Sequence, residues 1–379
     1  MGNLRLAAIA MTILVITAAC GDSDSSSIDA GEVASALDDP EHDSFPPALI
    51  DVDLVISGGP PPDGIPPIDQ PNYAAIEDID FLTDTEPVVV LDINGDVRAF
   101  PLQIMTWHEI VNDTIGDVPV TISFCPLCTS AIAFERTING EVNTFGTSGQ
   151  LFNSSLVMYD RLTETLWTHF DGRAVIGALT GTELTKRPMQ TVSWASFKES
   201  FPDGIVLTRD TGFGRNYGQN PYPGYDAVGE RPFLFVGEID GQLAAKERVL
   251  AVRGEETKVL QTSLLAEVST VTFQLDGVDV VALHTAGTSS ALDTPTLADG
   301  RDVGATGVFI AAVAGEAVDL TTNNDGTFTD SVSGSNFDIF GLAIDGPLVG
   351  SQLDRVEALD TFWFAIAAFT PDAEIIDVG

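Results

Sequence analysis

Two stretches of this chain resemble each other in the order of their features, and a repeat of that size decides the architecture before any single element does. When the 379-residue sequence is shifted by 159 positions, Asn94-Gly95-Asp96 falls on Arg253-Gly254-Glu255. Further along, a shift of 169 aligns Trp194 with Trp363. Identity is low but the order is kept, so the sequence predicts a tandem duplication, with chance similarity between β-rich segments as the alternative.

Each copy, over residues 87–207 and 248–375, is predicted to consist mainly of short strands. In the first copy an apolar strand meets Asn94-Gly95 and returns, which is the strongest short signal for a hairpin. A helix-like stretch over 102–111 follows, and a helix capped by Ser193 closes the copy. Further strands are expected over residues 118–124, 130–135, 156–160 and 173–176. The predicted fold class is therefore α+β, dominated by β structure.

The first twenty residues have the pattern of a secretory leader. Arg5 precedes an apolar run over 6–16 that is too short to span a bilayer as a mature helix. Small residues then lead to Cys20, as in the lipobox of bacterial lipoproteins, where the cysteine is lipidated and becomes the new N-terminus. Thr17 departs from the usual apolar residue, so ordinary signal cleavage is the alternative. We expect an extracytoplasmic lipoprotein anchored to the membrane through Cys20, in the periplasm or at the cell surface, where disulfides persist.

Composition divides the chain into four parts. Residues 1–20 form the expected leader, and 21–71 are expected to be a flexible tether rich in proline and glycine. The later part of that tether, from Phe45, is expected to wrap the first unit as extended chain. The first unit is placed at 72–230, including a connector rich in glycine and tyrosine, and the second, degenerate unit at 231–379.

The balance of charge is strongly acidic. There are 56 acidic and 17 basic residues, for a formal net charge of −39. Such a chain is repelled by nucleic acid phosphates and by anionic bilayer surfaces, so no nucleic acid partner is expected. Because like charges do not form long runs, we expect a solvated acidic surface rather than an acidic recognition tail. The sequence contains no nucleotide-binding motif and indicates no particular protein partner.

The candidate chemistry centres on Cys125 and Cys128, the only cysteines that remain after a leader ending at Cys20 is removed. They lie in a Cys-Pro-Leu-Cys turn between two apolar, strand-like runs. Two thiols at this spacing can bind one soft metal ion, act as a redox dithiol, close a plain disulfide staple or remain a buried reduced pair. Thiolates with imidazole suit copper or zinc. Thr129 follows Cys128, so the CxxCH signature of haem c is absent.

Few other residues could complete a metal or redox site. His108 and His169 are the candidate ligands, with His108 also a candidate proton carrier, and each has a packed structural histidine as its alternative. Because the connection over 112–117 is short, we expect the His108 ring to reach the two sulfurs, with Glu109 or His169 as the next nearest polar group. Under the shift of 159, His284 falls opposite Cys125, so the second copy is expected to have lost this site.

A second set of polar residues is predicted to line a ligand pocket. Its members combine arginine with tyrosine and carboxylates, which suits a small anionic ligand. They are Glu109, Tyr159, Asp160, Arg161, Arg215 and Tyr217. A hydrogen-bonded loop between the units is the alternative. Thr322–Gly326 faintly resembles a calcium loop, but it lacks the regular acidic spacing and the terminal glutamate, so we interpret it as a turn.

Three long stretches carry a resemblance to a known family. They are Val97–Arg136, Phe145–Trp167 and Thr211–Asp226, and the tail over 335–372 is also similar. With them the chain resembles the bacterial and archaeal DUF3179 proteins of unknown function, which resemble secreted or lipid-anchored proteins. The resemblance implies no activity and leaves open whether the chain is an enzyme. The leading hypothesis is binding of copper or zinc, or thiol–disulfide chemistry, and the alternative is a binding or scaffold module whose cysteines form only a staple.

Overall fold

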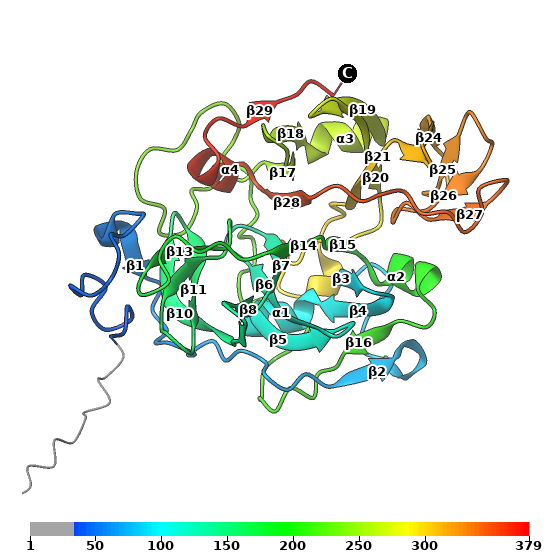
Figure 1. Ribbon diagram of the computed structural model, residues 1–379. Coiled ribbons are helices and arrows are strands. Elements are labelled where there is room, and N and C mark those ends of the chain that lie inside the picture. The colour runs from blue at the N-terminus through cyan, green and yellow to red at the C-terminus, as the bar shows by residue number, and fades with distance from the viewer. Residues whose placement is uncertain (1–33, 379) are drawn as a thin grey trace, which may run out of the picture. The chain divides into compact units, whose positions relative to one another are not determined.

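The computed structural model describes residues 34–378, and β-strands dominate it (Figure 1). The described part holds four α-helices of seven residues each among several small sheets. The predicted β-dominated fold with short helices is thereby confirmed. The predicted leader and its Cys20 lie outside the described residues. Between residues 34 and 378, no helix is long and apolar enough to cross a membrane.

The first sheet is built around the hairpin predicted at Asn94-Gly95. Both residues have positive φ, 56° and 83°, as the favoured two-residue hairpin turn requires. The strand order is β15-β3-β4-β16-β2, with β16 parallel to β4 and the other pairs antiparallel. The strands are β2 (Tyr73–Ala75), β3 (Pro87–Ile93), β4 (Asp96–Pro101), β15 (Gln190–Ser193) and β16 (Ile205–Leu207). As predicted, the Ser193 side chain caps a helix, α2 (Trp194–Ser200), by accepting a hydrogen bond from the Ser196 amide.

Helix α1 (Leu102–His108) follows β4 and ends three residues earlier than predicted. Glu109 has a φ of 59°, a conformation that stops a right-handed helix, and its amide donates to the Met105 carbonyl at 2.7 Å. Val111 then pairs with Ile122 in the next sheet. The apolar pattern of this stretch is shared by helix and buried strand, and pairing with a neighbouring strand decided the outcome.

The second sheet carries the cysteines and has the order β14-β7-β6-β5. Its strands are β5 (Ile110–Ile115), β6 (Val118–Cys125), β7 (Ser130–Glu135) and β14 (Lys186–Arg187). The last six residues of β6 are all buried, so both faces of this strand are covered. The turn between β6 and β7 therefore lies inside the protein, because other elements cover this end of the sheet.

A third sheet, of order β1-β10-β11-β12-β13, is joined by the segment that precedes the first unit. Its strands are β1 (Val55–Ser57), β10 (Phe145–Phe152), β11 (Ser155–Asp160), β12 (Leu166–Thr168) and β13 (Arg173–Ile176). Residues 45–71, here called the wrapping segment, pair through β1 with β10 and bridge Ile68 to Val111. They wrap the body as expected from Phe45 onward. The flexible tether predicted over residues 21–71 therefore extends too far toward the C-terminus, because its last part is held by backbone pairing.

The second half contains further sheets and two helices. The sheet of order β28-β17-β18-β29 contains β17 (Arg248–Val252), β18 (Lys258–Gln261), β28 (Ala358–Phe362) and β29 (Glu374–Ile375). Beside it lie α3 (Thr262–Val268) and the sheet of β19 (Thr270–Leu275), β20 (Val278–Thr285) and β21 (Ala305–Ile310). A four-stranded sheet follows with β24 (Leu320–Thr322), β25 (Phe328–Asp330), β26 (Asn336–Phe337) and β27 (Ala343–Asp345), and then α4 (Trp363–Phe369).

Short elements complete the fold. They are the hairpin of β8 (Thr137–Ile138) and β9 (Glu141–Val142), the hairpin of β22 (Ala312–Val313) and β23 (Glu316–Ala317), and three 3₁₀ turns, η1 (Val52–Leu54), η2 (Ile76–Asp78) and η3 (Leu297–Asp299).

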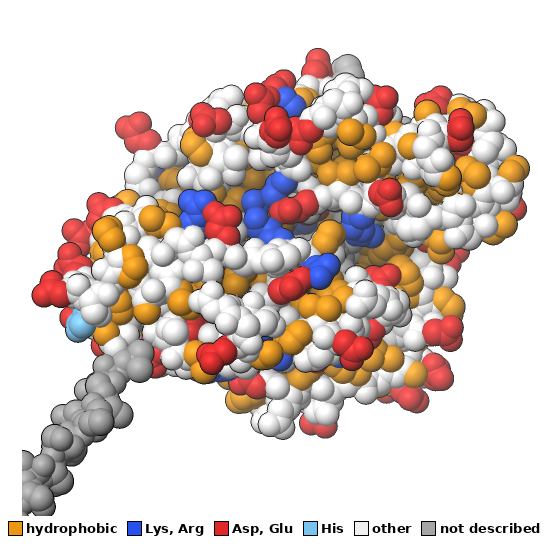
Figure 2. Space-filling model, in the orientation of Figure 1, with side chains coloured by type: hydrophobic (Ala, Val, Ile, Leu, Met, Phe, Trp, Pro, Cys, Tyr) orange, Lys and Arg blue, Asp and Glu red, His pale blue; other side chains and the backbone are white. Residues whose placement is uncertain are grey.

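Apolar packing joins the two halves around the cysteines. One core cluster contains Cys125 and Cys128 together with Phe362 and Trp363 of the second half. The surface is acidic, as expected: Figure 2 shows carboxylates spread over the visible face, with the fewer basic side chains gathered near its middle. The cysteine turn is thus a feature of the interior, enclosed by both halves.

Candidate functional site

The two cysteines lie in a tight loop between paired strands. Cys125 ends β6 and pairs with Ser130, the first residue of β7, so residues 125–130, here called the cysteine loop, are fixed at both ends. Thr129 has a φ of 51° and donates its amide hydrogen to the Pro126 carbonyl at 3.2 Å. Both cysteines are free thiols with 1% and 0% exposure. The loop turns their side chains toward each other, and the two thiols share a hydrogen bond.

The two thiols differ in acidity. Burial would raise the pKa of the Cys128 thiol, but hydrogen bonds with Cys125, Ser130 and Ser155 lower it below its ordinary value. The Cys128 Sγ lies 3.0 Å from the Ser130 Oγ and 3.6 Å from the Ser155 Oγ. Burial, followed by the hydrogen bond and the charge of Cys128, raises the pKa of Cys125 well above its ordinary value. Cys128 is therefore the sulfur that carries negative charge more readily, as an attacking thiolate must.

His169 supports Cys128 through Ser130. Its Nε2 lies 2.8 Å from the Ser130 Oγ, and its Nδ1 lies 2.7 Å from the Ser123 Oγ. Burial, with a smaller contribution from the charge of Arg253, lowers the pKa of His169 to about 3. The imidazole is thus neutral at pH 7 and can donate from one nitrogen while it accepts at the other. A buried hydrogen-bond chain runs from Ser123 through His169 and Ser130 to the Cys128 sulfur.

Glu109 is the carboxylate beside the cysteines. Burial, and then the charge of Cys125, raises its pKa well above the ordinary value. The side chain is 7% exposed, and among the described residues its carboxyl has no hydrogen-bond partner. It lines a cavity of about 220 Å³ together with Leu127 and Tyr222. Burial, and then the charges of Glu109 and Cys125, also raises the pKa of the Tyr222 phenol, which places these groups close together.

The remaining walls of this cavity come from two places. The wrapping segment contributes Gly58, Pro60 and Ile65, and the strands β10 and β11 contribute most of the others. Leu127, which lies between the two cysteines in the sequence, is 8% exposed and lines the cavity. The cavity therefore borders the cysteine loop, and it holds an unpartnered carboxyl group.

His108 is held by other residues. Its Nδ1 lies 2.7 Å from the Pro66 carbonyl oxygen, its Nε2 lies 2.6 Å from the Tyr217 hydroxyl, and its ring packs against Phe213. With both nitrogens occupied, His108 does not bind a sulfur or complete a metal site, so the expected contact with the sulfurs is not formed. The carboxyl of Glu109 lies beside the cysteines instead, because neighbouring residues at a helix end point in different directions.

The predicted ligands do not assemble into a metal-binding set. Over residues 34–378 no group of three or more histidine, cysteine or carboxylate side chains is placed to hold one ion. Cys125, Cys128 and His169 lie near one another, but His169 contacts Ser123 and Ser130 rather than a sulfur. The loop Thr322–Gly326 joins β24 to β25 as a turn, as expected.

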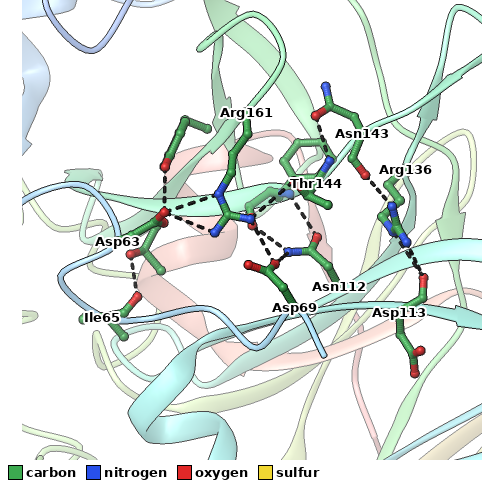
Figure 3. Close-up of polar contacts among 12 residues, drawn as sticks. Asp63, Ile65, Asp69, Asn112, Asp113, Arg136, Asn143, Thr144 and Arg161 are labelled. Carbon is green, nitrogen blue, oxygen red and sulfur yellow. Dashed lines mark hydrogen bonds and ion pairs between the residues drawn. The ribbon is translucent and has the colours of Figure 1, made fainter. Parts of the chain in front are cut away.

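The predicted pocket residues separate into different surroundings. Arg161 forms ion pairs with Asp63 at 3.1 Å and Asp69 at 2.9 Å, and the Tyr159 hydroxyl donates to Asp63 at 2.8 Å (Figure 3). Asp160 is buried and accepts from Asn143 at 2.8 Å. These side chains bind the wrapping segment and the body instead of lining an open pocket.

The other members of that set lie elsewhere. Tyr217 bonds His108, and the charge of the exposed Arg215 acts on the same histidine. Glu109 alone faces the small cavity. The six residues predicted as one pocket therefore do not form one.

Comparison with known proteins gives one match. A family model described as "Protein of unknown function (DUF3179)" matches residues 62–373. The chain belongs to the DUF3179 family. Curated proteins and solved structures contain nothing that matches. The family carries no described activity, so the function of this DUF3179 protein has to be argued from the geometry of its site.

Several residues of the site were missed at the sequence level. They contribute hydroxyl groups around the cysteines, and they are Ser123, Ser130, Ser155 and Thr361. For Ser123 a signal was present, since it lies two residues before Cys125 in an alternating strand and so points to the same face, and Ser130 lies at the other end of the same short turn. The others come from distant parts of the chain and had no local signal.

Proposed function

We propose that this DUF3179 protein carries out thiol–disulfide exchange on a small molecule, with Cys128 as the attacking thiol and Cys125 as the resolving thiol. The observation that carries the proposal is the contact between the Cys128 Sγ and the Ser130 Oγ at 3.0 Å, continued to His169 at 2.8 Å. A structural staple needs no such chain of hydroxyls and imidazole beside one sulfur. A thiolate does, because buried negative charge requires hydrogen-bond donors.

The exchange would proceed in two steps. The Cys128 thiolate attacks one sulfur of a substrate disulfide, which forms a mixed disulfide and releases the first substrate thiolate. Glu109 in its carboxylate form takes the proton from Cys125, which then attacks the Cys128 sulfur and releases the second substrate thiolate. The protein dithiol is oxidised by two electrons and the substrate disulfide is reduced by two. The released thiolates take up protons from Glu109 and water.

The size of the cavity limits the substrate. Both sulfurs are buried, and the adjacent space measures about 220 Å³. A folded protein partner could not bring a disulfide to them without displacing Leu127 and the wrapping segment. The proposal is therefore for a low-molecular-weight thiol or its disulfide, which enters beside Glu109.

The deciding experiment measures reduction of glutathione disulfide by the fully reduced chain. Stoichiometric release of glutathione is expected, with formation of a Cys125–Cys128 disulfide detected by mass. Cys128→Ser should abolish the reaction, Cys125→Ser should stop it at the mixed disulfide, and Ser44→Ala at an exposed serine should change nothing. A chain that stays reduced under these conditions, or a Cys125→Ser variant that forms no mixed disulfide, would contradict the proposal.

Binding of a single soft metal ion is the second candidate. It is favoured by the direct contact of the two thiols, since two thiolates suit copper(I). Protein purified without oxygen should then contain about one copper or zinc per chain, and Cys125→Ser should remove it. Metal-free protein that reduces glutathione disulfide favours exchange. Metal-free protein in which Cys125→Ser lowers only thermal stability favours the staple and a non-catalytic binding or scaffold module.

We also propose that the chain is a tandem duplication, with units over 72–230 and 231–379. The support is the order β3-β4-α1-β5-β6-β7, which matches β17-β18-α3-β19-β20-β21. In both series a later strand joins antiparallel, β15 to β3 and β28 to β17, and another joins parallel, β16 to β4 and β29 to β18. Superposition of 87–207 on 248–375 in an experimental structure tests this proposal.

Helix ends and tryptophans give further support to the duplication. Glu109 and Ser269 both have positive φ, 59° and 65°, and each carbonyl accepts from a residue of the following hairpin, at 2.7 and 2.8 Å. Trp194 and Trp363 are both buried, and each begins a short helix. Helices and strands here correspond at a shift of 160, one more than in the sequence match. Cys125 then corresponds to Thr285, and the second unit lacks the thiols.

The last proposal concerns location. We propose membrane attachment through lipid on Cys20, supported by the apolar run and the small residues before it. Cys20→Ser should move the protein from the membrane fraction to the soluble fraction of an expressing bacterium. Wild-type protein that is soluble and begins at another residue would rule the anchor out.

A further inference from the structure

A large cavity lies in the second half, away from the cysteines. It measures about 660 Å³, within the range of about 300–1,000 Å³ typical of small-molecule sites. Its walls come from α3, the end of β20, the segment over 301–304 and the turn over 322–326 between β24 and β25 (Figure 1). The turn that faintly resembled a calcium loop in the sequence is thus one wall of this cavity.

The position of the cavity parallels that of the small cavity beside Glu109. Ser269, which follows α3 as Glu109 follows α1, lines the large cavity, and Thr285 ends β20 as Cys125 ends β6. The turn between β24 and β25 lines one cavity, and residues near the turn between β10 and β11 line the other. This parallel uses element positions alone and is independent of the proposed thiol chemistry. Each half has a cavity at the end of the corresponding helix, α1 in the first half and α3 in the second, but the second half has no thiol there.

Neutral polar side chains form the largest group in the lining. They are the hydroxyls and amides of Thr262, Ser263, Ser269, Thr285, Thr322, Asn323 and Asn324. Two polar atoms at this wall, the Thr262 Oγ1 and the Arg248 Nε, are buried and have no hydrogen-bond partner within residues 34–378. Burial lowers the pKa of His284, another lining residue, although a hydrogen bond with the Val303 backbone acts in the other direction, so its ring is neutral at pH 7 and keeps one nitrogen for a ligand.

The charged groups of the lining are already engaged. Glu247 accepts from the Ser263 hydroxyl at 2.7 Å, and Asp302 accepts from the backbone amides of Gly287, Thr288 and Gly304. Arg301 forms ion pairs with carboxylates outside the lining. Arg301 is therefore compensated, whereas Glu247 and Asp302 form no ion pair among the described residues and keep their negative charge.

The two remaining charged residues of the lining are divided in the same way. Arg248 pairs with Asp360 at 3.2 Å, and Asp325 accepts from the Thr327 hydroxyl at 2.7 Å. The arginines of the lining are therefore compensated, and its free capacity lies in neutral hydroxyl and amide groups and in three carboxylates that form no ion pair among the described residues. A ligand that matches such a wall carries many neutral donors and acceptors on a compact frame.

We propose that this cavity binds a neutral polyhydroxylated ligand, a carbohydrate of one or two sugar rings. Hydroxyl groups of a sugar both donate and accept, so they can pair with the unengaged amide of Asn324, the hydroxyl of Ser269 and the ring of His284. An anionic ligand would meet the carboxylates of Glu247, Asp302 and Asp325, whereas the hydroxyls of a sugar can donate hydrogen bonds to them. An apolar ligand would leave this polar wall unpaired.

The test uses the full chain with a panel of sugars. Glucose, galactose, mannose and maltose are titrated by calorimetry and by saturation-transfer NMR, beside glucuronate and glucosamine as charged counterparts. At least one neutral sugar should bind, and glucuronate should bind more weakly than the neutral sugar that binds best, because its carboxylate meets those of the lining. Absence of binding by every neutral sugar at about 50 mM, which excludes useful affinity, would overturn the proposal.

Two matched variants of α3 localise the binding. Ala266→Trp fills the cavity from an exposed position that lines it, and Leu264→Trp places the same ring at an exposed position of the same helix outside the lining. We expect Ala266→Trp to weaken binding by at least about tenfold and Leu264→Trp to leave it unchanged. Asn324→Ala should weaken it less. Equal binding by wild type and Ala266→Trp would place the sugar elsewhere and overturn the inference, whereas Cys125→Ser should leave it intact.

Discussion

Thr361 donates its hydroxyl hydrogen to the Cys128 carbonyl at 2.8 Å, although the two residues lie 233 positions apart. The Phe362 amide donates to the same carbonyl at 3.2 Å. Strand β28 of the second half therefore binds the backbone of the cysteine loop in the first half. The second half lacks the thiols, but it fixes the backbone that positions them.

Thr361→Val is the first prediction. It removes the hydroxyl and leaves the buried Cys128 carbonyl with one donor, which should lower the free energy of unfolding by about 1 kcal/mol. The cysteine loop should also loosen, so alkylation of Cys128 should become faster in the native state. Urea denaturation and iodoacetamide trapping measure the two effects. Thr321→Val, which removes an exposed threonine hydroxyl from a strand, is the control, and equal effects of the two variants would contradict this role.

Ser130→Ala tests the support of the thiolate. The change deletes the hydroxyl that lies 3.0 Å from the Cys128 Sγ and breaks its link to His169. The pKa of Cys128 should rise, and the pH profile of its alkylation should move upward by about one unit. Ser130→Thr keeps a hydroxyl and should recover most of the wild-type profile. An unchanged midpoint in Ser130→Ala would show that the hydroxyl does not act on the sulfur.

Local patterns predicted much of the first half of the fold. The Asn94-Gly95 turn and the Ser193 cap depend on residues a few positions apart, and both are as predicted. The strand that ends at Cys125 was also predicted to within one residue, because apolar β-branched runs bounded by turns leave few choices. The end of α1 was not, since the left-handed Glu109 has no sequence signal and strand pairing competes with the helix there.

The site was predicted only in part, for a physical reason. The proximity of Cys125 and Cys128 follows from a short turn, whereas their partners arrive from distant segments. Whether His108 or Glu109 lies beside the cysteines depends on which side of the helix end faces the cavity. The sequence analysis predicted His108 for that position. His169 was considered as a metal ligand, but its hydrogen bonds to Ser123 and Ser130 are set by the packing of two sheets, which no spacing in the sequence encodes.

Glu109→Gln should change how stability depends on pH. Burial raises the pKa of Glu109 above its ordinary 4.5, so above that pH the unfolded chain releases a proton that the folded chain keeps. The stability contributed by the protonated carboxyl is complete below pH 4.5 and is lost as the pH rises toward the folded pKa. Wild type should therefore lose up to about 1.4 kcal/mol per pH unit more than the variant in that window.

The measurement is urea denaturation of both proteins at a series of pH values from 4 to 8. Glu77→Gln, at an exposed carboxylate, should keep the wild-type slope. Parallel curves for wild type and Glu109→Gln would show that this carboxyl ionises as freely in the folded protein as in the unfolded chain.

His169 gives a pH dependence of the opposite sign. Its pKa is about 3 in the folded protein against 6.5 for an ordinary histidine, so between these values the unfolded chain binds the extra proton. Stability should fall as the pH falls from 6.5 toward 3, and His169→Gln should remove that part of the slope. His42→Gln, at an exposed histidine, is the control, and a slope that is the same in wild type and His169→Gln would contradict burial of a neutral ring.

Arg161→Ala should open the small cavity by releasing the wrapping segment. Arg161 binds Asp63 at 3.1 Å and Asp69 at 2.9 Å, and the chain between these carboxylates includes Ile65, one wall of the cavity (Figure 3). Without these ion pairs the segment should detach more often, because β1 is only three residues long and pairs with one strand. Cleavage of this proline-rich stretch by an added protease should become faster, and so should labelling of Cys128 by a bulky maleimide.

Arg173→Ala supplies the control for that experiment. It removes an exposed ion pair with Glu183 on the same sheet but touches no part of the wrapping segment. If the wrapping segment closes the entrance of the small cavity, protease cleavage and maleimide labelling should both become faster in Arg161→Ala. Both rates should stay at the wild-type value in Arg173→Ala. Faster cleavage without faster labelling would mean that the sulfurs are reached by another route, and the small-molecule entrance proposed beside Glu109 would have to be placed elsewhere.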